Sequence, residues 1–166
     1  MRNRVKYLIY SFNYNFLKVS KESAKDVSEL GELSLQIKRK GWTCLHDIVW
    51  NILSWGKLRE WRLVNQEAEI IATAEVMPRV WLFNFMKVQD SIHIGPCWTN
   101  PLYRGNGFYP SLLKLIIFKT AFSRYYIFCN QENIASIRGI EKAGFHFIGY
   151  GYKTKYGVYR LLSKAL

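Results

Sequence analysis

A short turn rich in glycine, residues 103–110 (YRGNGFYP), stands between a strand pattern and a helix pattern. The strand pattern covers residues 91–98, and the helix pattern covers 111–122 and is apolar on nearly all sides. Glycines allow a sharp turn, and the free amides and positive dipole end of a helix start face outward. The order predicts an anion-binding cradle at the helix start, to which Arg104 adds a charge-assisted contact for a diphosphate.

The turn alone leaves two interpretations open. An ordinary strand-to-helix turn also uses glycines, for geometry alone. A Walker-type phosphate loop is excluded because no Gly-Lys-Ser/Thr follows, and the spacing does not fit a dinucleotide-binding fingerprint. An anion site and a purely structural turn therefore both remain.

The strand before the turn contains Pro96, which cannot donate to a hydrogen-bonding ladder. Alternation places Ile92 and Ile94 on one face of this strand, and His93 and Cys97 on the other. Because proline belongs at an edge or a bulge, the strand should separate from a neighbour near its C-terminal end. We therefore expect a gap in the sheet at this point.

The remaining patterns alternate between strand and helix. The C-terminal half continues with a buried strand at 125–129, a helix after 130–133 that is ended by Gly144, and a hairpin of 145–152 with 158–162. The N-terminal half is expected to hold a strand at 5–10, a helix at 21–39 closed by Gly41, a helix at 45–55, a hairpin of 60–64 with 68–77, and a short strand at 81–86. This order predicts an α/β (α+β) arrangement around one mixed sheet.

The composition indicates one domain. The chain has 166 residues, of which 49% are hydrophobic and 16% aromatic, enough for a core without disulfides or metals. We find no linker or repeat, and the apolar runs are far shorter than the ~20 residues of a membrane span. Three isolated cysteines (Cys44, Cys97 and Cys129) and the lack of a signal-peptide pattern suggest a cytoplasmic protein without a metal site.

The charge favours anionic ligands in general. Lys and Arg number 24 against 12 Asp and Glu, which gives a formal net charge of +12. Nucleic acids, acidic membrane surfaces, nucleotide sugars and coenzyme A are all polyanions that fit this positive charge. Nucleic acid is disfavoured, because the chain has neither RNP-like aromatic motifs nor a concentrated basic stripe. The only tight basic run, Lys38-Arg39-Lys40, is interpreted as a solvated helix end.

The turn and its downstream residues together resemble the coenzyme A-binding half of the GNAT N-acetyltransferases. The resemblance extends over residues 91–152, through Arg104-x-x-Gly107, then Asn133-x-x-Ser136, then the segment 141–145 (EKAGF). It implies a single mixed, largely antiparallel sheet with splayed central strands flanked by helices. It further implies one domain over 1–166, with an acceptor-side half at 1–90 and an acetyl-coenzyme A-binding half at 91–166.

The resemblance also assigns the cofactor-binding residues. The pyrophosphate is expected on the backbone of Arg104, Gly105, Asn106, Gly107, Phe108 and Tyr109. Trp98 and Thr99 would line the pantetheine from one side, and Asn133 and Ser136 from the other. Acetyl-coenzyme A is then the co-substrate.

Two positions depart from the family pattern. Tyr109, followed by Pro110, stands where the motif of the family ends in Gly or Ala, and it puts a close approach of the helix start to the phosphates in doubt. Ile140 replaces the tyrosine that many members place just before the Glu-Lys pair as a general acid. Either the departing thiolate takes a proton from another group or from water, or the protein does not catalyse.

Two residues are candidates for the general base. His93 lies a few residues before the cofactor loop, where many family members carry a carboxylate, and a reference pKa of about 6.5 suits proton removal at neutral pH. A lone strand histidine is, however, more often packed or exposed. Glu75, in the 68–77 strand, is the other candidate.

The sequence thus favours an N-acetyltransferase that acts on a primary amine of a small molecule. A nucleotide-linked amino sugar is preferred as the acceptor, because the positive charge of the chain suits an anionic substrate. A protein or ribosomal amine and a non-catalytic acyl-coenzyme A sensor are the alternatives, ahead of a basic RNA-binding module. The acyl chain length and the oligomeric state, monomer or homodimer, stay open.

Overall fold

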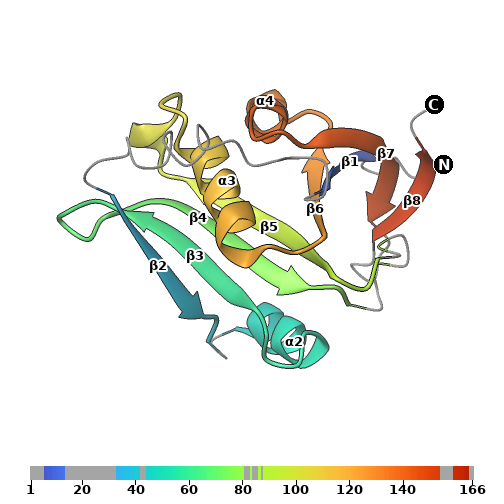
Figure 1. Cartoon of the computed structure of the whole chain (residues 1–166), viewed down its shortest axis with the longest axis horizontal. Helices are drawn as coiled ribbons and strands as arrows, with labels where there is room; N and C mark the ends of the chain where they lie inside the picture. Colours follow the sequence, from blue (N-terminus) through green and yellow to red (C-terminus); the bar gives the residue numbers. More distant parts are fainter. Residues whose placement is uncertain are drawn as a thin grey trace.

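A computed structural model describes residues 6–13, 33–41, 44–80, 83, 86, 88–153 and 159–164. Its elements are β1 (Lys6–Asn13), β2 (Ser34–Arg39), α2 (Leu45–Leu53), β3 (Arg59–Val64), β4 (Ile70–Pro78), β5 (Ser91–Thr99), the 3-10 turn η2 (Pro101–Tyr103), α3 (Phe108–Thr120), β6 (Arg124–Asn130), α4 (Ile134–Lys142), β7 (His146–Lys153) and β8 (Tyr159–Lys164). The described strands form one eight-stranded sheet in the order β2-β3-β4-β5-β6-β1-β7-β8 (Figure 1).

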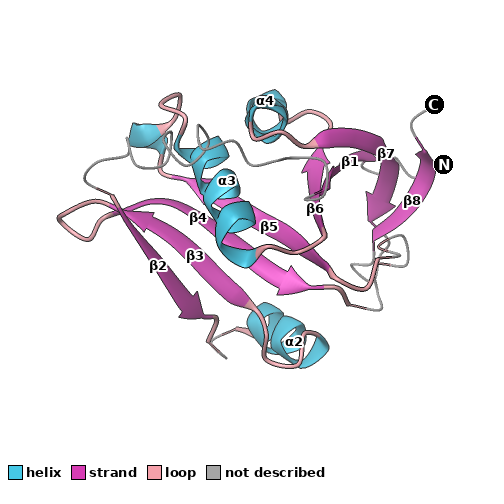
Figure 2. Ribbon diagram, viewed as in Figure 1, coloured by secondary structure: helices cyan, strands magenta, loops and turns pink. Residues whose placement is uncertain are grey.

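The sheet is mixed and largely antiparallel, as the sequence predicts. Among the described strands only β5 and β6 run parallel, and every other neighbouring pair is antiparallel. The predicted hairpins β3–β4 and β7–β8 are confirmed, as are α2, α3, β6 and α4 (Figure 2). The α/β (α+β) class expected from the order of the patterns is therefore correct.

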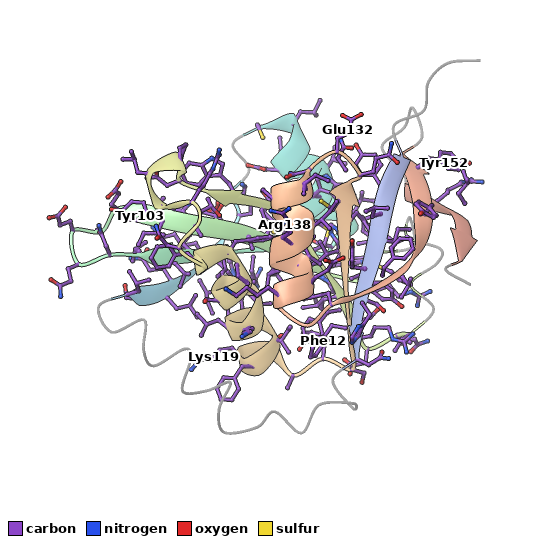
Figure 3. The ribbon with its side chains drawn as sticks, turned by 90° about the horizontal axis from the view of Figure 1, so that it is seen from above. Phe12, Tyr103, Lys119, Glu132, Arg138 and Tyr152 are labelled. Atoms are coloured by element: carbon purple, nitrogen blue, oxygen red, sulfur yellow. The ribbon has the colours of Figure 1, made fainter. Side chains whose placement is uncertain are left out.

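Helices cover both faces of the sheet. The helices α3 and α4 lie on one face (Figure 3), where Leu112 and Ile116 of α3 pack with Val76 of β4 in the larger core. On the opposite face, Trp50 of α2 packs against a second core that contains Met77. Because Val76 and Met77 are neighbours in one strand, their side chains necessarily point to opposite faces. We call these the α3/α4 face and the α2 face.

The helix expected at 21–39 is wrong in its C-terminal part. Residues Ser34–Arg39 form the edge strand β2, in which Leu35 pairs with Leu63 and Ile37 with Trp61 of β3. The apolar residues of this part recur at every second position, which is the period of a strand. Residues 21–32 lie outside the described part of the chain. Because β2 ends at Arg39, the basic run at 38–40 marks the end of a strand and not of a helix.

Two smaller expectations also change. Pro110 is the third residue of α3, which begins at Phe108, and not the first. Of the short strand expected at 81–86, the structure describes only Phe83 and Met86, and neither is in a strand. Both residues are buried in the core on the α2 face.

The first strand, β1, lies inside the C-terminal part of the sheet. It is inserted between β6 and β7, with Ile9 opposite Phe128 on one side and Gly149 on the other. Its Ile9 and Tyr10 side chains are almost completely buried. The halves 1–90 and 91–166 therefore share one sheet and are interleaved in it.

The gap expected near Pro96 is present. β5 and β6 pair only from Ser91–Arg124 to Ile94–Ile127, although both strands continue beyond these residues. On the other side of β5, the register passes from Val76–Ile94 to Ala74–Cys97, so that Glu75 alone faces Gly95 and Pro96. This bulge turns the end of β5 away from β6 and opens the sheet between them.

Within the described residues, no helix is long and apolar enough to cross a membrane.

Candidate functional site

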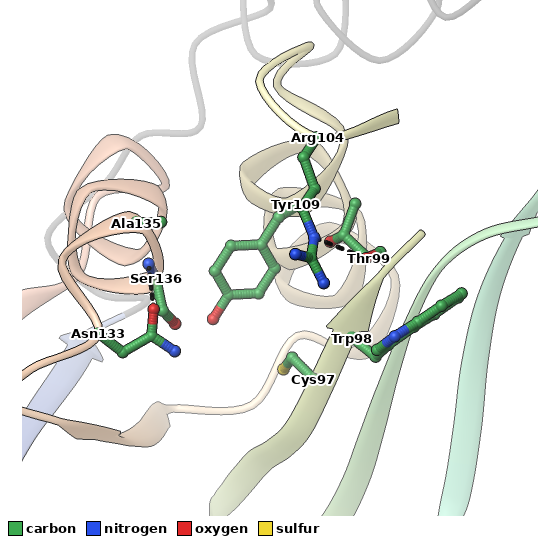
Figure 4. Close-up of a pocket in the computed structure, with 8 residues that line it drawn as sticks. All are labelled: Cys97, Trp98, Thr99, Arg104, Tyr109, Asn133, Ala135 and Ser136. Atoms are coloured by element: carbon green, nitrogen blue, oxygen red, sulfur yellow. Dashed lines mark hydrogen bonds between the residues drawn. The ribbon is translucent and has the colours of Figure 1, made fainter. Parts of the chain in front are cut away.

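A cavity of about 320 Å³ opens where β5 and β6 separate. Figure 4 shows it bounded by the end of β5 on one side and by the start of α4 on the other, with α3 behind. It is lined by Cys97, Trp98, Thr99, Arg104, Tyr109, Asn133, Ala135 and Ser136. Six of these residues are among the ten that the sequence assigned to the cofactor, and the other four form the turn at its edge.

The glycines of this turn hold the backbone in a conformation that other residues rarely adopt. Gly105 has φ 85° and Gly107 has φ 81°, and a Cβ atom added at either would meet nothing within 4 Å. Gly107 is the N-cap of α3 and offers no side chain to the amides of the first turn, which have no intrahelical acceptor. The helix start thus presents open amides and a positive dipole end to an anion.

Arg104 adds a positive charge beside these amides. Its Nε donates a hydrogen bond to the carbonyl oxygen of Thr99 at 3.1 Å, which holds the guanidinium against the end of β5. Figure 4 shows the guanidinium at the edge of the cavity. A diphosphate placed at the start of α3 would lie within the field of both the helix dipole and this side chain.

The opposite wall of the cavity comes from the start of α4. Asn133 is the N-cap of this helix, and its Oδ1 accepts a hydrogen bond from the amide of Ser136 at 3.1 Å. The cap fixes the side chain of Asn133, and Ser136 lies beside it on the cavity wall. They face Trp98 and Thr99 across the gap, as the resemblance implied.

Tyr109 enters the cleft between these walls. Its ring lies against Gly139 of α4, where a Cβ atom would be only 2.5 Å from Tyr109 Cδ1. Its hydroxyl points toward Ser136 and Cys97 (Figure 4). Burial, and next the neighbouring Cys97, hold the pKa of Tyr109 well above 10, so that the phenol is neutral. The tyrosine thus packs on α4, while the glycine side of the turn stays open.

Cys97 is a protonated thiol at neutral pH. Burial is the main cause that raises the pKa of Cys97 to about 12, and the charge of Glu75 contributes. Since the thiolate is the nucleophilic form of cysteine, an acyl-enzyme on Cys97 is disfavoured. The residue forms part of the cavity wall.

His93 does not have the properties expected of a general base. Only 7% of its surface is exposed, and its ring stacks on Phe128 at 4.4 Å between centroids and tilts against Phe83 at 5.2 Å. Burial lowers the pKa of His93 to about 3, and Nδ1 has no hydrogen-bond partner among the described residues. This environment disfavours His93 as a base poised near neutral pH, because its ring belongs to an aromatic cluster.

Glu75, the other candidate for the general base, is a buried carboxylate with an ion-pair partner. Its side chain is 9% exposed and lies on the α2 face, opposite the bulge at Gly95 and Pro96. Oε1 accepts a hydrogen bond from Nζ of Lys40 at 2.8 Å, and Oε2 has no partner among the described residues. The carboxylate thus lies beside the gap in the sheet, across from the cavity.

Lys40 joins three carboxylates into one cluster. Its Nζ lies 3.9 Å from Oδ1 of Asp47 and 3.9 Å from Oε1 of Glu60, in addition to its bond with Glu75. Burial alone would lower the pKa of Lys40, but the hydrogen bond and charge of Glu75, then the charges of Glu60 and Asp47, raise it above 10.5. Lys40 is therefore an ammonium in this structure.

Sequence reasoning missed three members of this cluster. Lys40 follows β2, Asp47 is in α2, and Glu60 is in β3, so only strand pairing and helix packing bring them to Glu75. A partial signal was available, because Glu60 and Glu75 are directly opposite each other in the correctly predicted hairpin. Within the part of the chain that the structure describes, no group of acidic, His and Cys side chains could hold a metal ion.

The structure also places Ile140, which stands at the tyrosine position of the resemblance. Its side chain is completely buried in the core on the α3/α4 face. An aliphatic side chain has no proton to give, so any protonation of a leaving group depends on other residues or on water.

The fold is that of the GNAT acetyltransferases. The aminoglycoside acetyltransferase AAC(6')-Ib, solved with ribostamycin and coenzyme A, has a TM-score of 0.56 at 16% identity over 77% of this chain and 91% of its own. The aminoglycoside 6'-N-acetyltransferase AAC(6')-Ih from Acinetobacter baumannii has a TM-score of 0.53 at 14% identity, over 69% of this chain and 90% of its own.

A putative GNAT-family acetyltransferase from Novosphingobium aromaticivorans has a TM-score of 0.55 at 14% identity. The alignment covers 88% of this chain but only 61% of that longer protein. No protein-family model matches the sequence, and no curated protein is significantly similar to it. At these identities the likeness concerns the fold.

Proposed function

We propose that the protein is an acyl-coenzyme A-dependent N-acyltransferase that moves an acetyl group to a primary amine of a small molecule. The proposal rests above all on the cavity at the point where β5 leaves β6, with the open amides of α3 at its edge. A thioester arm that enters a sheet through such a gap reaches the opposite face. On that face lies the partly unpaired carboxylate of Glu75.

The cofactor would lie along the α3/α4 face. In this arrangement the turn from Arg104 to Tyr109 holds the pyrophosphate through its amides and the guanidinium. Trp98 and Thr99 then contact the pantetheine from β5, and Asn133 and Ser136 contact it from α4. Residues 91–166 supply these groups, and residues 1–90 supply Glu75 and its cluster on the acceptor side.

Acyl transfer to an amine requires a neutral amine, a polarised carbonyl and protonation of the departing thiolate. We assign the first task to Glu75, because its Oε2 is buried without a partner and can accept a proton from an ammonium beside the gap. The backbone amides near Cys97 and Trp98 are suited to the second. His93 is unsuited to act as the base, because its pKa is about 3.

For the third task we assign Tyr109 as a hydrogen-bond donor to the thiolate. Its hydroxyl is in the cavity, between β5 and α4, and it stays protonated. With a pKa well above that of a thiol, it stabilises the thiolate by a hydrogen bond, and the proton itself comes from water.

The charge beside the gap favours a cationic acceptor over the anionic one expected from the overall charge. Asp47, Glu60 and Glu75 lie around the ammonium of Lys40, and Glu60 also pairs with the guanidinium of Arg62, so three carboxylates face two cations. An ammonium group gains from these carboxylates, whereas a phosphate close to the amine is repelled. A nucleotide-linked amino sugar then fits only if its phosphates lie away from this cluster.

A second function is favoured by Ile140. Since this position has no ionisable group, a sensor that binds acyl-coenzyme A without turnover fits the same cavity. The two functions share the cofactor site and differ in chemistry alone.

One experiment separates them. Acetyl-coenzyme A binding is measured by calorimetry, and coenzyme A release is followed with di- and polyamines, aminoglycosides, nucleotide-linked amino sugars and an N-terminal peptide amine. Binding with release on a cationic amine supports the enzyme, and binding without release on any amine supports the sensor. Absence of binding contradicts both.

A further inference from the structure

The ammonium of Lys40 is hydrogen-bonded to Glu75, the carboxylate that the proposed function assigns to the acceptor amine. Its Nζ lies 2.8 Å from Oε1 of Glu75, whose Oε2 is buried and unpaired among the described residues. The backbone beside Lys40 is held in place, because Nδ2 of the buried Asn51 donates to the carbonyl oxygens of Lys40 at 3.2 Å and Gly41 at 3.1 Å. Lys40 is thus a primary amine fixed beside the candidate base.

This amine is also beside the gap in the sheet. Glu75 faces Gly95 and Pro96 at the bulge, and the next residue pair, Ala74 with Cys97, reaches the cavity wall. The charge of Glu75 also contributes to the raised pKa of the Cys97 thiol, after burial as the main cause. An acetyl group that passes through the gap from the cavity therefore approaches the Lys40–Glu75 pair.

We propose, on the basis of the proposed function, that Lys40 is an internal acyl acceptor. When no acceptor amine is present, the enzyme transfers the acetyl group of acetyl-coenzyme A to Nζ of Lys40. The carboxylate of Glu75 takes one proton from the ammonium, and the freed lone pair of Nζ forms a bond to the acetyl carbonyl carbon. The carbon–sulfur bond breaks and its electron pair leaves with the sulfur. The attacking nitrogen loses its second proton to water, and the thiolate takes a proton from water. The products are coenzyme A and N-acetylated Lys40.

Acetylation of Lys40 changes the charge of the site. The amide that results is neutral, so Asp47, Glu60 and Glu75 lose the ammonium that they share, and only Glu60 keeps a cation, Arg62. Glu75 is then released from its ion pair, and the cluster carries more negative charge toward a cationic acceptor. A small amine that binds to Glu75 competes with Lys40 both for the carboxylate and for the acetyl group.

The test uses the full chain with acetyl-coenzyme A and no amine. Acetylation is mapped by mass spectrometry after digestion with a protease that does not cleave at lysine. Exposed Lys57 and Lys119 report the non-enzymatic background, and Lys119 is at the far end of α3 from the turn (Figure 3). We expect Lys40 to be acetylated at least about tenfold faster than either, because it is held beside the site.

A second measurement shows whether the cofactor site delivers the acetyl group. Excess free coenzyme A should suppress the acetylation of Lys40 but leave that of Lys119 unchanged, since only the first depends on the cavity. In Lys40→Arg the fast phase should vanish, and in Lys119→Arg it should persist.

Acetylation of Lys40 at the rate of Lys119, or without protection by coenzyme A, overturns the inference even if small amines are acetylated. A protein that does not bind acetyl-coenzyme A at all overturns the proposed function and this inference together. Calorimetry on the same preparation distinguishes the two failures.

Discussion

The ring of Tyr109 and the backbone of Gly139 are in direct contact, because a Cβ atom at residue 139 would lie 2.5 Å from Tyr109 Cδ1. The contact joins α3 to α4 across the cleft that we assign to the cofactor. It explains how the chain accommodates a tyrosine where the family motif has Gly or Ala. The bulk that this position adds is matched by a residue without a side chain on the facing helix.

Gly139→Ala should therefore destabilise the protein only when Tyr109 is present. Alanine is about 1 kcal/mol better than glycine in a helix, but the clash with the ring is expected to cost about 1–3 kcal/mol. In a Tyr109→Ala background the same change should be stabilising. Chemical denaturation of the four variants in a double-mutant cycle gives the coupling free energy. A coupling near zero would mean that the two residues do not pack as described.

Tyr109→Phe keeps this packing and removes only the hydroxyl. We expect acetyl-coenzyme A binding to be retained and kcat to fall by about a hundredfold, the usual effect of losing one donor to a developing anion. Calorimetry and the rate of coenzyme A release measure the two quantities. Unchanged kcat would remove Tyr109 from the mechanism and leave the thiolate to water alone.

Gly107→Trp should abolish binding of acetyl-coenzyme A. The indole would fill the open space beside the helix start, and the left-handed conformation at φ 81° costs about 1–2 kcal/mol for any other residue. Gly56→Trp is the matched control, because Gly56 has φ 70° and equally open surroundings away from the cavity. Both variants should lose stability, but only the first should lose binding. Retained binding in Gly107→Trp would show that the cradle is elsewhere.

Glu75→Gln should lower kcat by about a hundredfold to ten-thousandfold, since the amide cannot accept a proton. The variant keeps the shape of the side chain, so acetyl-coenzyme A should still bind with nearly the same affinity. Glu67→Gln, in the exposed β3–β4 turn, removes the same charge without an effect on rate. A Glu75→Gln enzyme with full kcat would contradict the assignment of the base.

His93→Phe should leave the pH–rate profile unchanged, because the ring is neutral and stacks on Phe128. The substitution should instead change how the free energy of unfolding depends on pH. Burial lowers the pKa of His93 from 6.5 to about 3, so below pH 6.5 the unfolded chain binds a proton that the folded protein does not. This histidine therefore makes the free energy of unfolding decrease by about 1.4 kcal/mol per pH unit as the pH falls from 6.5 towards 3.

Denaturation curves of the two proteins at a series of pH values test this prediction. The difference in the free energy of unfolding between wild type and His93→Phe separates the proton bound by His93 from those bound by other groups. A difference that is independent of pH would show that His93 titrates normally, and a shifted pH–rate profile would restore it as a candidate base.

Local patterns were sufficient for the cofactor side of the protein. The turn from Arg104 to Tyr109 and the cap at Asn133 are contiguous segments whose shape depends on their own glycines and side chains. The gap beside Pro96 follows from a missing backbone donor, which is also a local property. The roles of these residues in binding remain predictions.

The error at residues 34–39 concerns the period of the apolar residues. Leu33, Leu35 and Ile37 have the period of a strand, but they were combined with upstream residues into a helical pattern. The edge pairing of Leu35 with Leu63 and Ile37 with Trp61 decides the conformation. Long-range pairing overrides helix propensity in such short segments.

By itself, the sequence determined the class of fold, the order of most elements and the turn that opens the start of α3, because these depend on hydrophobic period, glycine and proline. Only the tertiary structure decided that β1 lies between β6 and β7, that His93 is enclosed by aromatic rings, and that Lys40 meets Asp47, Glu60 and Glu75. The residues that bury these side chains and set their electrostatic environment belong to segments far apart in the chain. Their pKa values and partners are therefore properties of the packed protein and of no local pattern.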